Sequence, residues 1–218
     1  MTIVAVVLIA GWMFHASLLR FVALGLIVDD RSGPAPAVLL LDGDRQFDVA
    51  AELSHAGAAT ILVYRSPPDR LARMGIMPRG DETARRELLK RGVSDENLEI
   101  LAGDSASRSR IAKALGQWLA DHPDQKVSVL CERFTSRTWT IVFQRAVAPP
   151  LANNIQIVPL RNRQFDETNW WRSKPGTMAF VNSCIRLGFH FWNSEVEVKG
   201  GERTTAEFRA AFAGDSGG

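Results

Sequence analysis

The chain has 218 residues, of which 46% are hydrophobic and 23% are charged, so a wholly disordered chain and a fibrous repeat are excluded. Lys and Arg number 26 against 24 Asp and Glu, and the resulting net charge of +2 gives no general attraction to nucleic acid. Two cysteines, Cys131 and Cys184, are too few for a disulfide framework or a complete cysteine zinc site.

The N-terminal segment is the most apolar part of the chain. Ile3 to Phe14 is an unbroken apolar run, and Phe21 to Val28 is a second one. As one helix, Thr2 to Val28 measures about 40 Å at a rise of about 1.5 Å per residue, which exceeds the roughly 30 Å of a bilayer's hydrocarbon core. We therefore expect residues 1–28 to form a transmembrane anchor that contacts lipid through residues 3–28.

Two alternatives to this anchor stay open, a cleaved signal peptide and a buried soluble helix. A signal peptide would carry basic residues before its apolar run, and this chain has none there. Arg20 is costly inside a membrane unless it pairs or reaches the interface. Because Arg20 and Arg31 follow the run, the positive-inside rule favours a cytoplasmic domain, but two residues leave the side of the membrane open.

Residues 29–36, rich in Gly, Pro and Ala, are predicted to be a linker. After them, short apolar runs alternate with segments of helical periodicity over residues 37–194. The continuous apolar character of the runs is typical of strands buried on both faces. The predicted strands are Ala37–Leu41, Ala59–Tyr64, Leu98–Leu101, Lys126–Cys131 and Ile155–Val158.

The segments between these strands are predicted to be helices, apart from a loop over Arg65–Gly80 that contains three prolines. The helix after the third strand has the clearest stripe, from Ile111 to Leu119, and Ser105 or Ser107 caps it. The predicted helices are Arg45–His55, Asp81–Arg91, a segment ending near Asp121, Thr135–Val147 and a last one ending near Trp192.

Strands that alternate with helices form a parallel sheet, so the predicted fold is an α/β, Rossmann-like open parallel sheet with flanking helices and one N-terminal transmembrane helix. Ligands of such sheets bind at the carboxyl ends of the strands, near the point where the strand order reverses. The segments that follow the strands are therefore the candidate site: Asp42–Arg45, Tyr64–Pro68, Gly103–Ser109 and Glu132–Arg137.

The last helical segment combines tryptophans with basic residues. Trp170, Trp171 and Trp192 lie beside Arg172 and Lys174, a mixture that is common at membrane interfaces. A helix packed on the sheet is the commoner fate of an apolar stripe, and we favour it here. Residues 195–218 are polar and are predicted to be a flexible tail.

Four segments resemble the YdcF/SanA/ElyC family of envelope-associated domains: Val38–Arg45, Glu82–Val93, Leu130–Arg137 and Trp171–Trp192. The resemblance implies a Rossmann-like domain, anchored in the bacterial inner (cytoplasmic) membrane, that acts in cell-envelope or exopolysaccharide biogenesis. It also implies S-adenosylmethionine as a cofactor to consider, which the residues alone leave unknown. On this interpretation the protein has membrane-protein partners and binds a small anionic ligand, and it does not bind nucleic acid.

The family's first motif is a glycine-rich turn followed by Arg, and Asp42-Gly43-Asp44-Arg45 stands in its place. By this match Asp42 and Asp44 are candidate catalytic residues, while Gly43 and Arg45 are candidate ligand-binding residues. The two acids disfavour phosphate at this turn unless a divalent metal intervenes. The structural alternative is turn formation and helix capping.

The other motifs match single residues. Thr135 stands where the family has a histidine, so the family's chemistry is not expected to be intact. Glu82 matches a helix-borne carboxylate and is the third catalytic candidate. The remaining candidate ligand-binding residues are Ser66, Ser105, Arg137 and Trp171.

Arginines are frequent after the predicted strands, and together they would favour a phosphate, sugar-phosphate or uronate. The four histidines are scattered without metal-ligand spacing, so no metal site is predicted. The leading hypothesis is an accessory or anionic ligand-binding subunit, and the alternatives are an active transferase or hydrolase and a structural scaffold. The arginines that follow the predicted strands are Arg45, Arg65, Arg108, Arg110, Arg133 and Arg137.

Overall fold

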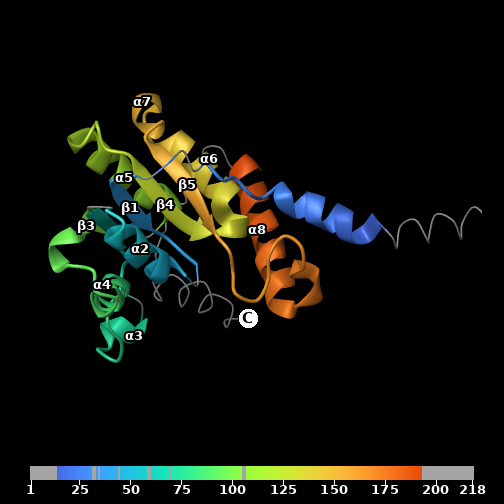
Figure 1. The fold of residues 1–218 in the computed structure, drawn as a ribbon, viewed down its shortest axis with the longest axis horizontal. Coiled ribbons are helices and arrows are strands. Elements are labelled where there is room, and N and C mark those ends of the chain that lie inside the picture. The colour runs from blue at the N-terminus through green and yellow to red at the C-terminus, as the bar shows by residue number, and fades with distance from the viewer. Residues whose placement is uncertain are drawn as a thin grey trace, which may run out of the picture.

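The computed structural model describes residues 14–30, 33, 35–43, 45–57, 60–68, 70–104 and 107–192. They form an α/β fold around a five-stranded, all-parallel sheet with the order β3-β2-β1-β4-β5 (Figure 1). This confirms the predicted open parallel sheet. The strands are β1 (Ala37–Leu40), β2 (Thr60–Arg65), β3 (Leu98–Asp104), β4 (Val127–Glu132) and β5 (Ile155–Leu160).

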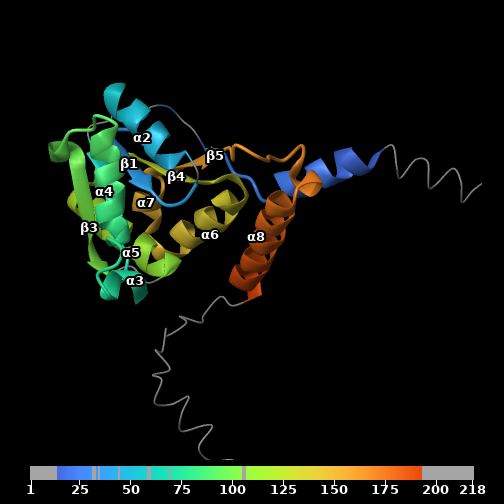
Figure 2. The ribbon, with the colours of Figure 1, turned by 90° about the horizontal axis from the view of Figure 1, so that it is seen from below.

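Helices cover both faces of the sheet (Figure 2). Alternate residues of β1 divide between two cores, because successive side chains of a strand point to opposite faces. Ala37 and Leu39 lie in the core under α5 and α6, and Val38 and Leu40 lie in the core under α2 and α4. The longer helices are α2 (Gln46–His55), α4 (Gly80–Lys90), α5 (Arg108–Asp121), α6 (Ser136–Ala146) and α8 (Lys174–Trp192).

Two short helices occur where none was predicted. α3 (Arg70–Arg73) lies inside the segment expected to be a loop, because a run of good helix formers stands there between Pro68 and Gly75. α7 (Pro149–Ala152) begins with proline, whose fixed φ angle suits the first position of a helix. Three 3₁₀ turns complete the fold: η1 (Asp95–Asn97), η2 (Arg133–Thr135) and η3 (Trp170–Arg172).

The N-terminal segment is helical over residues 14–24 and then runs along the body. The Arg137 amide donates to the Leu26 carbonyl (3.1 Å), the Val28 amide to Ser136 Oγ (2.9 Å), and the Asp30 amide to the Ile157 carbonyl (3.1 Å). Within the described part of the chain, no helix is both long enough and apolar enough to cross a membrane. Residues 3–13 of the predicted anchor lie outside the described residues.

α8 packs mainly on α6, η2 and η3, which corrects the expectation that it lies on the sheet. Its buried side joins a third apolar cluster, in which the rings of Trp170 and Phe180 stack with centroids 3.8 Å apart. Ala23 and Leu26 of the N-terminal segment enter the same cluster. The last helix therefore packs against the N-terminal segment, a pairing that sequence periodicity does not reveal. The predicted tail lies outside the described residues.

Candidate functional site

The strand order reverses between β1 and β4, and this is where ligands bind in open α/β sheets. Asp42 follows β1, and its Oδ1 accepts a hydrogen bond from the Glu132 amide at the end of β4 (2.9 Å). Gly43 has a φ of 123°, and a Cβ there would lie 3.3 Å from Leu160 Cδ1. The turn needs glycine both for its backbone conformation and for its close approach to β5.

Asp42 is half-buried, and burial raises the pKa of its carboxyl group above the ordinary value of 3.8. The Glu132 amide, Arg108, Arg186 and the Thr135 hydroxyl act in the opposite direction, because each favours the ionised form. Thr135 stands where the family resemblance expects a histidine, so a hydroxyl rather than an imidazole lies beside this acid.

Arg108 begins α5 and lies half-buried beside Asp42. Its guanidinium carbon sits 5.1 Å from the ring centroid of Trp139, in position for a cation–π contact. Burial and repulsion from Arg186 both lower the pKa of Arg108, although the group stays charged at neutral pH. Two arginines, Arg108 and Arg186, therefore lie near one half-buried acid.

A third arginine and a histidine extend this cluster. Burial and the positive charges of Arg108 and Arg145 lower the pKa of His190, so its ring is neutral at pH 7. The Arg145 side chain also donates a hydrogen bond to the His190 carbonyl. We call Asp42, Arg108, Arg145, Arg186 and His190 the strand-tip cluster.

Sequence reasoning found Asp42 and Arg108 but missed the other three members of the strand-tip cluster. Arg145 comes from α6, while Arg186 and His190 come from α8, far along the chain from the strand ends. Their spacing of four residues places Arg186 and His190 on one face of α8, and this was the available signal. This spacing indicates a site only when α8 is known to pack against α6.

The two reactive side chains closest to Asp42 are held in their protonated forms. Cys131 is buried, and burial together with the Asp42 charge raises the pKa of its thiol well above the ordinary range. The same two causes raise the pKa of Tyr64. Because a thiolate is the nucleophilic form of cysteine, Cys131 is an inert core residue here.

Glu82 and Ser66 belong to the connection between β2 and α4. Glu82 accepts a hydrogen bond from the Arg79 amide (3.3 Å), so it caps the start of α4. Arg79 also donates to the Ser66 carbonyl (3.4 Å) and pairs with the buried Asp81, which lies 3.9 Å from Arg65. These contacts give Glu82 and Ser66 structural roles.

The other predicted site residues lie apart from one another. Arg45 is exposed in front of α2, and Trp171 packs in the apolar cluster beside the N-terminal segment. Arg137 holds Leu26 through its backbone, while its buried Nε has no hydrogen-bond partner. Asp44 and Ser105 lie outside the described residues.

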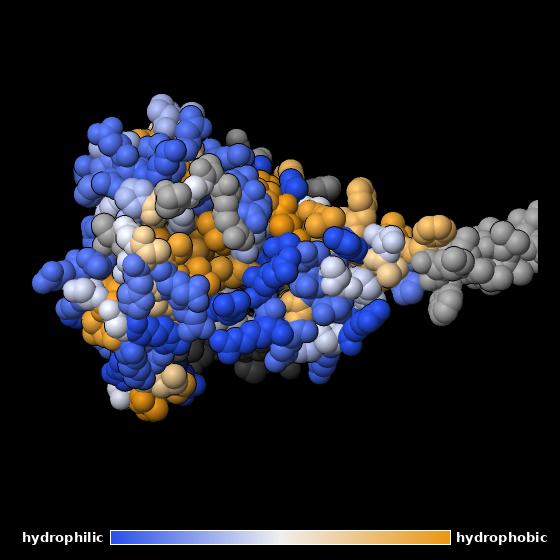
Figure 3. All heavy atoms as spheres, viewed as in Figure 1, coloured by the Kyte–Doolittle hydropathy of each residue, from blue (hydrophilic) through white to orange (hydrophobic). Residues whose placement is uncertain are grey.

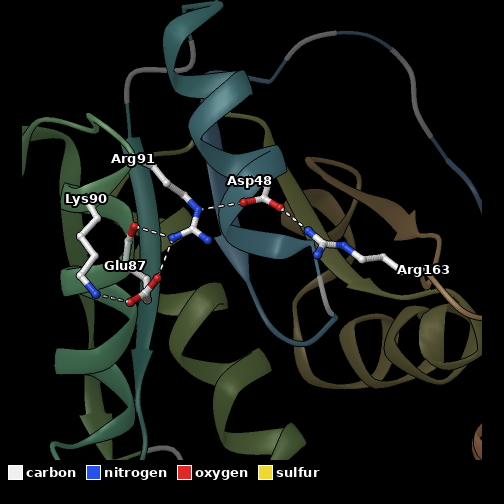
Figure 4. Close-up of polar contacts among 5 residues, drawn as sticks. All are labelled: Asp48, Glu87, Lys90, Arg91 and Arg163. Atoms are coloured by element: carbon white, nitrogen blue, oxygen red, sulfur yellow. Dashed lines mark hydrogen bonds and ion pairs between the residues drawn. The ribbon is translucent and has the colours of Figure 1, made fainter.

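The predicted ring of arginines is only partly present. Arg108 faces Asp42, whereas Arg133 forms two hydrogen bonds with the buried Glu167 (2.6 and 2.7 Å) and Arg65 lies beside Asp81. On another face, a surface network joins α2 to α4 (Figure 4). In it Asp48 accepts from Arg91 and Arg163, and Arg91 also contacts Glu87, so these arginines are occupied by structural acids.

The strand-tip cluster suits an anion better than a metal or a cationic cofactor. Among the described residues, no three His, Cys, Asp or Glu side chains gather closely enough to hold a metal ion. S-adenosylmethionine carries a positive sulfonium, and three arginines in the cluster would repel it. No family model, curated protein or solved structure matches this chain.

Proposed function

We propose that this protein binds a small phosphorylated or carboxylated ligand at the strand-tip cluster, as an accessory subunit in cell-envelope or exopolysaccharide biogenesis. The observation that carries the proposal is the approach of Arg108 and Arg186, from two different helices, to Asp42 at the reversal point of the sheet, with Arg145 beside His190. Arginine is the residue best suited to planar, two-point recognition of phosphate and carboxylate.

A binding role fits the cluster better than a nucleophilic one. The Cys131 thiol is kept protonated, and Thr135 replaces the histidine that the family resemblance expects. The cationic groups outnumber Asp42, so an anion would relieve the repulsion between Arg108 and Arg186. The envelope role itself comes from the YdcF-like resemblance.

We further propose that the N-terminal segment anchors the domain in the bacterial cytoplasmic membrane, and that residues 25–28, which run along the body, connect the anchor to the domain. Apolar side chains on the described part of this segment are exposed, among them Phe14, Leu18 and Phe21 (Figure 3). Exposed apolar residues on a projecting helix are unusual for a monomer in water and are typical of a surface that contacts lipid or another protein. The apolar run that begins at Ile3 extends the same character.

Ligand binding is tested by thermal unfolding of the full chain in detergent, with inorganic phosphate, UDP-glucose, glucuronate or S-adenosylmethionine added. A ligand at one hundred times its Kd contributes about 2.7 kcal/mol, which raises the Tm of a chain of this size by about 5–10 °C. We expect an anionic probe to stabilise the protein, and Arg186→Gln to abolish the shift.

Arg85→Gln is the matched control, because Arg85 is an exposed helix arginine paired with Asp95 at a distance from the strand ends. It should keep the full ligand-dependent shift. An absence of stabilisation by all probes, or an equal shift in Arg186→Gln and the unaltered chain, would contradict the proposed anion site.

A hydrolase or transferase is the second candidate, and His190 favours it. A neutral imidazole beside two guanidinium groups can accept a proton from water or a hydroxyl while the arginines hold the anion. In that case His190→Gln would abolish turnover of a phosphorylated probe but keep its thermal shift. Unchanged turnover in His190→Gln would eliminate this candidate.

A further inference from the structure

α8 is apolar on two opposite faces, and only one of them is covered. Phe180, Ser183 and Leu187 lie on the face toward the body. On the opposite face the residues spaced by three and four positions are all apolar, and between 45% and 64% of each side chain is exposed. We call these residues the α8 stripe: Met178, Val181, Ile185 and Phe189.

A helix with apolar side chains on two opposite faces is normally covered on both of them, by protein or by lipid. In the described structure α6 and the apolar cluster around Trp170 cover one side of α8. The α8 stripe therefore requires a partner that covers several turns of helix.

The placement of the N-terminal helix identifies this partner. Residues 14–24 project from the body beside α8, and Leu19 and Ala23 pack in the cluster that also holds Phe180. In both views α8 lies crosswise to this projecting helix, with α6 on the side away from it (Figures 1 and 2). If the projecting helix enters a bilayer along its own axis, α8 lies parallel to the bilayer surface.

The depths of the polar groups agree with this placement. Arg20 lies four residues before the end of the N-terminal helix at residue 24, or about 6 Å along the helix axis. Helices that lie in a membrane interface bury their apolar face by roughly 5–10 Å, so Arg20 would sit within reach of the head groups. The half-buried Trp171 and the exposed Arg172 and Lys174 stand before the α8 stripe, and such aromatic and basic residues are typical of the interface.

We propose that the α8 stripe lies in the lipid interface of the membrane that the N-terminal helix enters. Phe21, Val22 and Leu24 of the N-terminal helix are exposed apolar residues as well, and this helix packs against α8 through the cluster that holds Ala23 and Phe180. The inference rests on the anchoring part of the proposed function and is independent of the ligand.

The test uses the full chain with Cys184→Ser, reconstituted into vesicles of phosphatidylcholine and phosphatidylglycerol. Ile185→Cys carries an environment-sensitive fluorophore, and Met178→Cys provides a second position on the stripe. We expect a blue-shifted emission at both positions and at least twofold quenching by lipids that carry a nitroxide near the head group. Asn153→Cys, at the exposed end of α7, should show neither effect.

Val22→Cys separates the two proposals. Quenching at Val22 without quenching at Ile185 and Met178 would overturn the interfacial role of α8 and leave the anchor intact, whereas an absence of quenching at all three would overturn both. A blue-shifted but unquenched stripe would mean that a second copy or the C-terminal tail covers it, and that result also overturns the proposal. Unfolding curves of each variant verify that it is folded.

Discussion

Asp42 is the residue on which the site depends. It accepts a backbone hydrogen bond at the end of β4, and burial raises its pKa even though two arginines lie near it. An ionised acid held where burial disfavours its charge lowers the stability of the folded state. Such acids are concentrated in functional sites, because a purely structural position would tolerate a neutral side chain.

Asp42→Asn is predicted to raise the Tm at pH 7. The native pKa lies above the ordinary value of 3.8, so the penalty develops as the pH rises from 3.8 through the native value and persists above it. Asparagine removes the penalty and keeps the oxygen that accepts from Glu132. Thermal unfolding at pH 7 and below pH 3.8 measures the effect, which should disappear at the lower pH.

Asp48→Asn is a control for which the Tm is expected to change in the opposite direction. Its hydrogen bond with Arg91 lowers the pKa of the Asp48 carboxyl, so ionised Asp48 contributes stability above pH 3.8 that is lost as the pH falls further. At pH 7 this variant should have a lower Tm than the unaltered chain. Shifts of the same sign in the two variants would contradict the assignment of Asp42 as a strained acid.

At the scale of the elements, sequence pattern located most strands and helices but did not arrange the last one. β1 was predictable because its run of aliphatic residues is buried on both sides of a parallel sheet. α8 was predictable as a helix, but periodicity cannot decide which of two apolar faces is buried. Asp42 was therefore predictable as a strand-end residue, whereas Arg186 and His190 depended on the packing of α8.

Two glycines of α8 are predicted to respond in opposite ways to alanine. A Cβ at Gly176 would meet the Trp170 carbonyl oxygen, so Gly176→Ala should reduce the free energy of unfolding by about 3 kcal/mol. A Cβ at Gly188 would meet no other atom within 4 Å, so Gly188→Ala should raise the free energy of unfolding by about 1 kcal/mol through helix propensity alone. Chemical denaturation of both variants in detergent measures the difference, and equal effects would contradict the packing of α8 on η3.

At the scale of the whole molecule, the stability of the folded state depends on pH in two separate ranges, one due to His190 and one due to Glu167. Burial and two arginines lower the pKa of His190, so the neutral ring contributes stability that is lost as the pH falls below 6.5. Glu167 follows at lower pH: burial alone would raise its pKa, but the hydrogen bonds from Arg133 lower it. Its stabilising contribution is present above pH 4.5 and is lost below that value.

The Tm is therefore predicted to fall in two stages on acidification, the first below pH 6.5 and the second below pH 4.5. His190→Gln should remove the first stage and keep the second, because glutamine does not titrate. The measurement is a series of unfolding curves from pH 8 to pH 3, and a first stage that persists in His190→Gln would contradict this assignment.

The hydrogen bonds that the backbone groups of Leu26, Val28 and Asp30 form with the body have a mechanical consequence. They attach the end of the N-terminal helix to the start of α6 and to the edge strand β5. A pulling force on that helix is thus divided between two rigid elements, and the joint does not swivel as a glycine-rich tether does. The domain and the N-terminal helix therefore move as one body, and the hydrogen bonds that follow the helix fix the orientation of the domain relative to it.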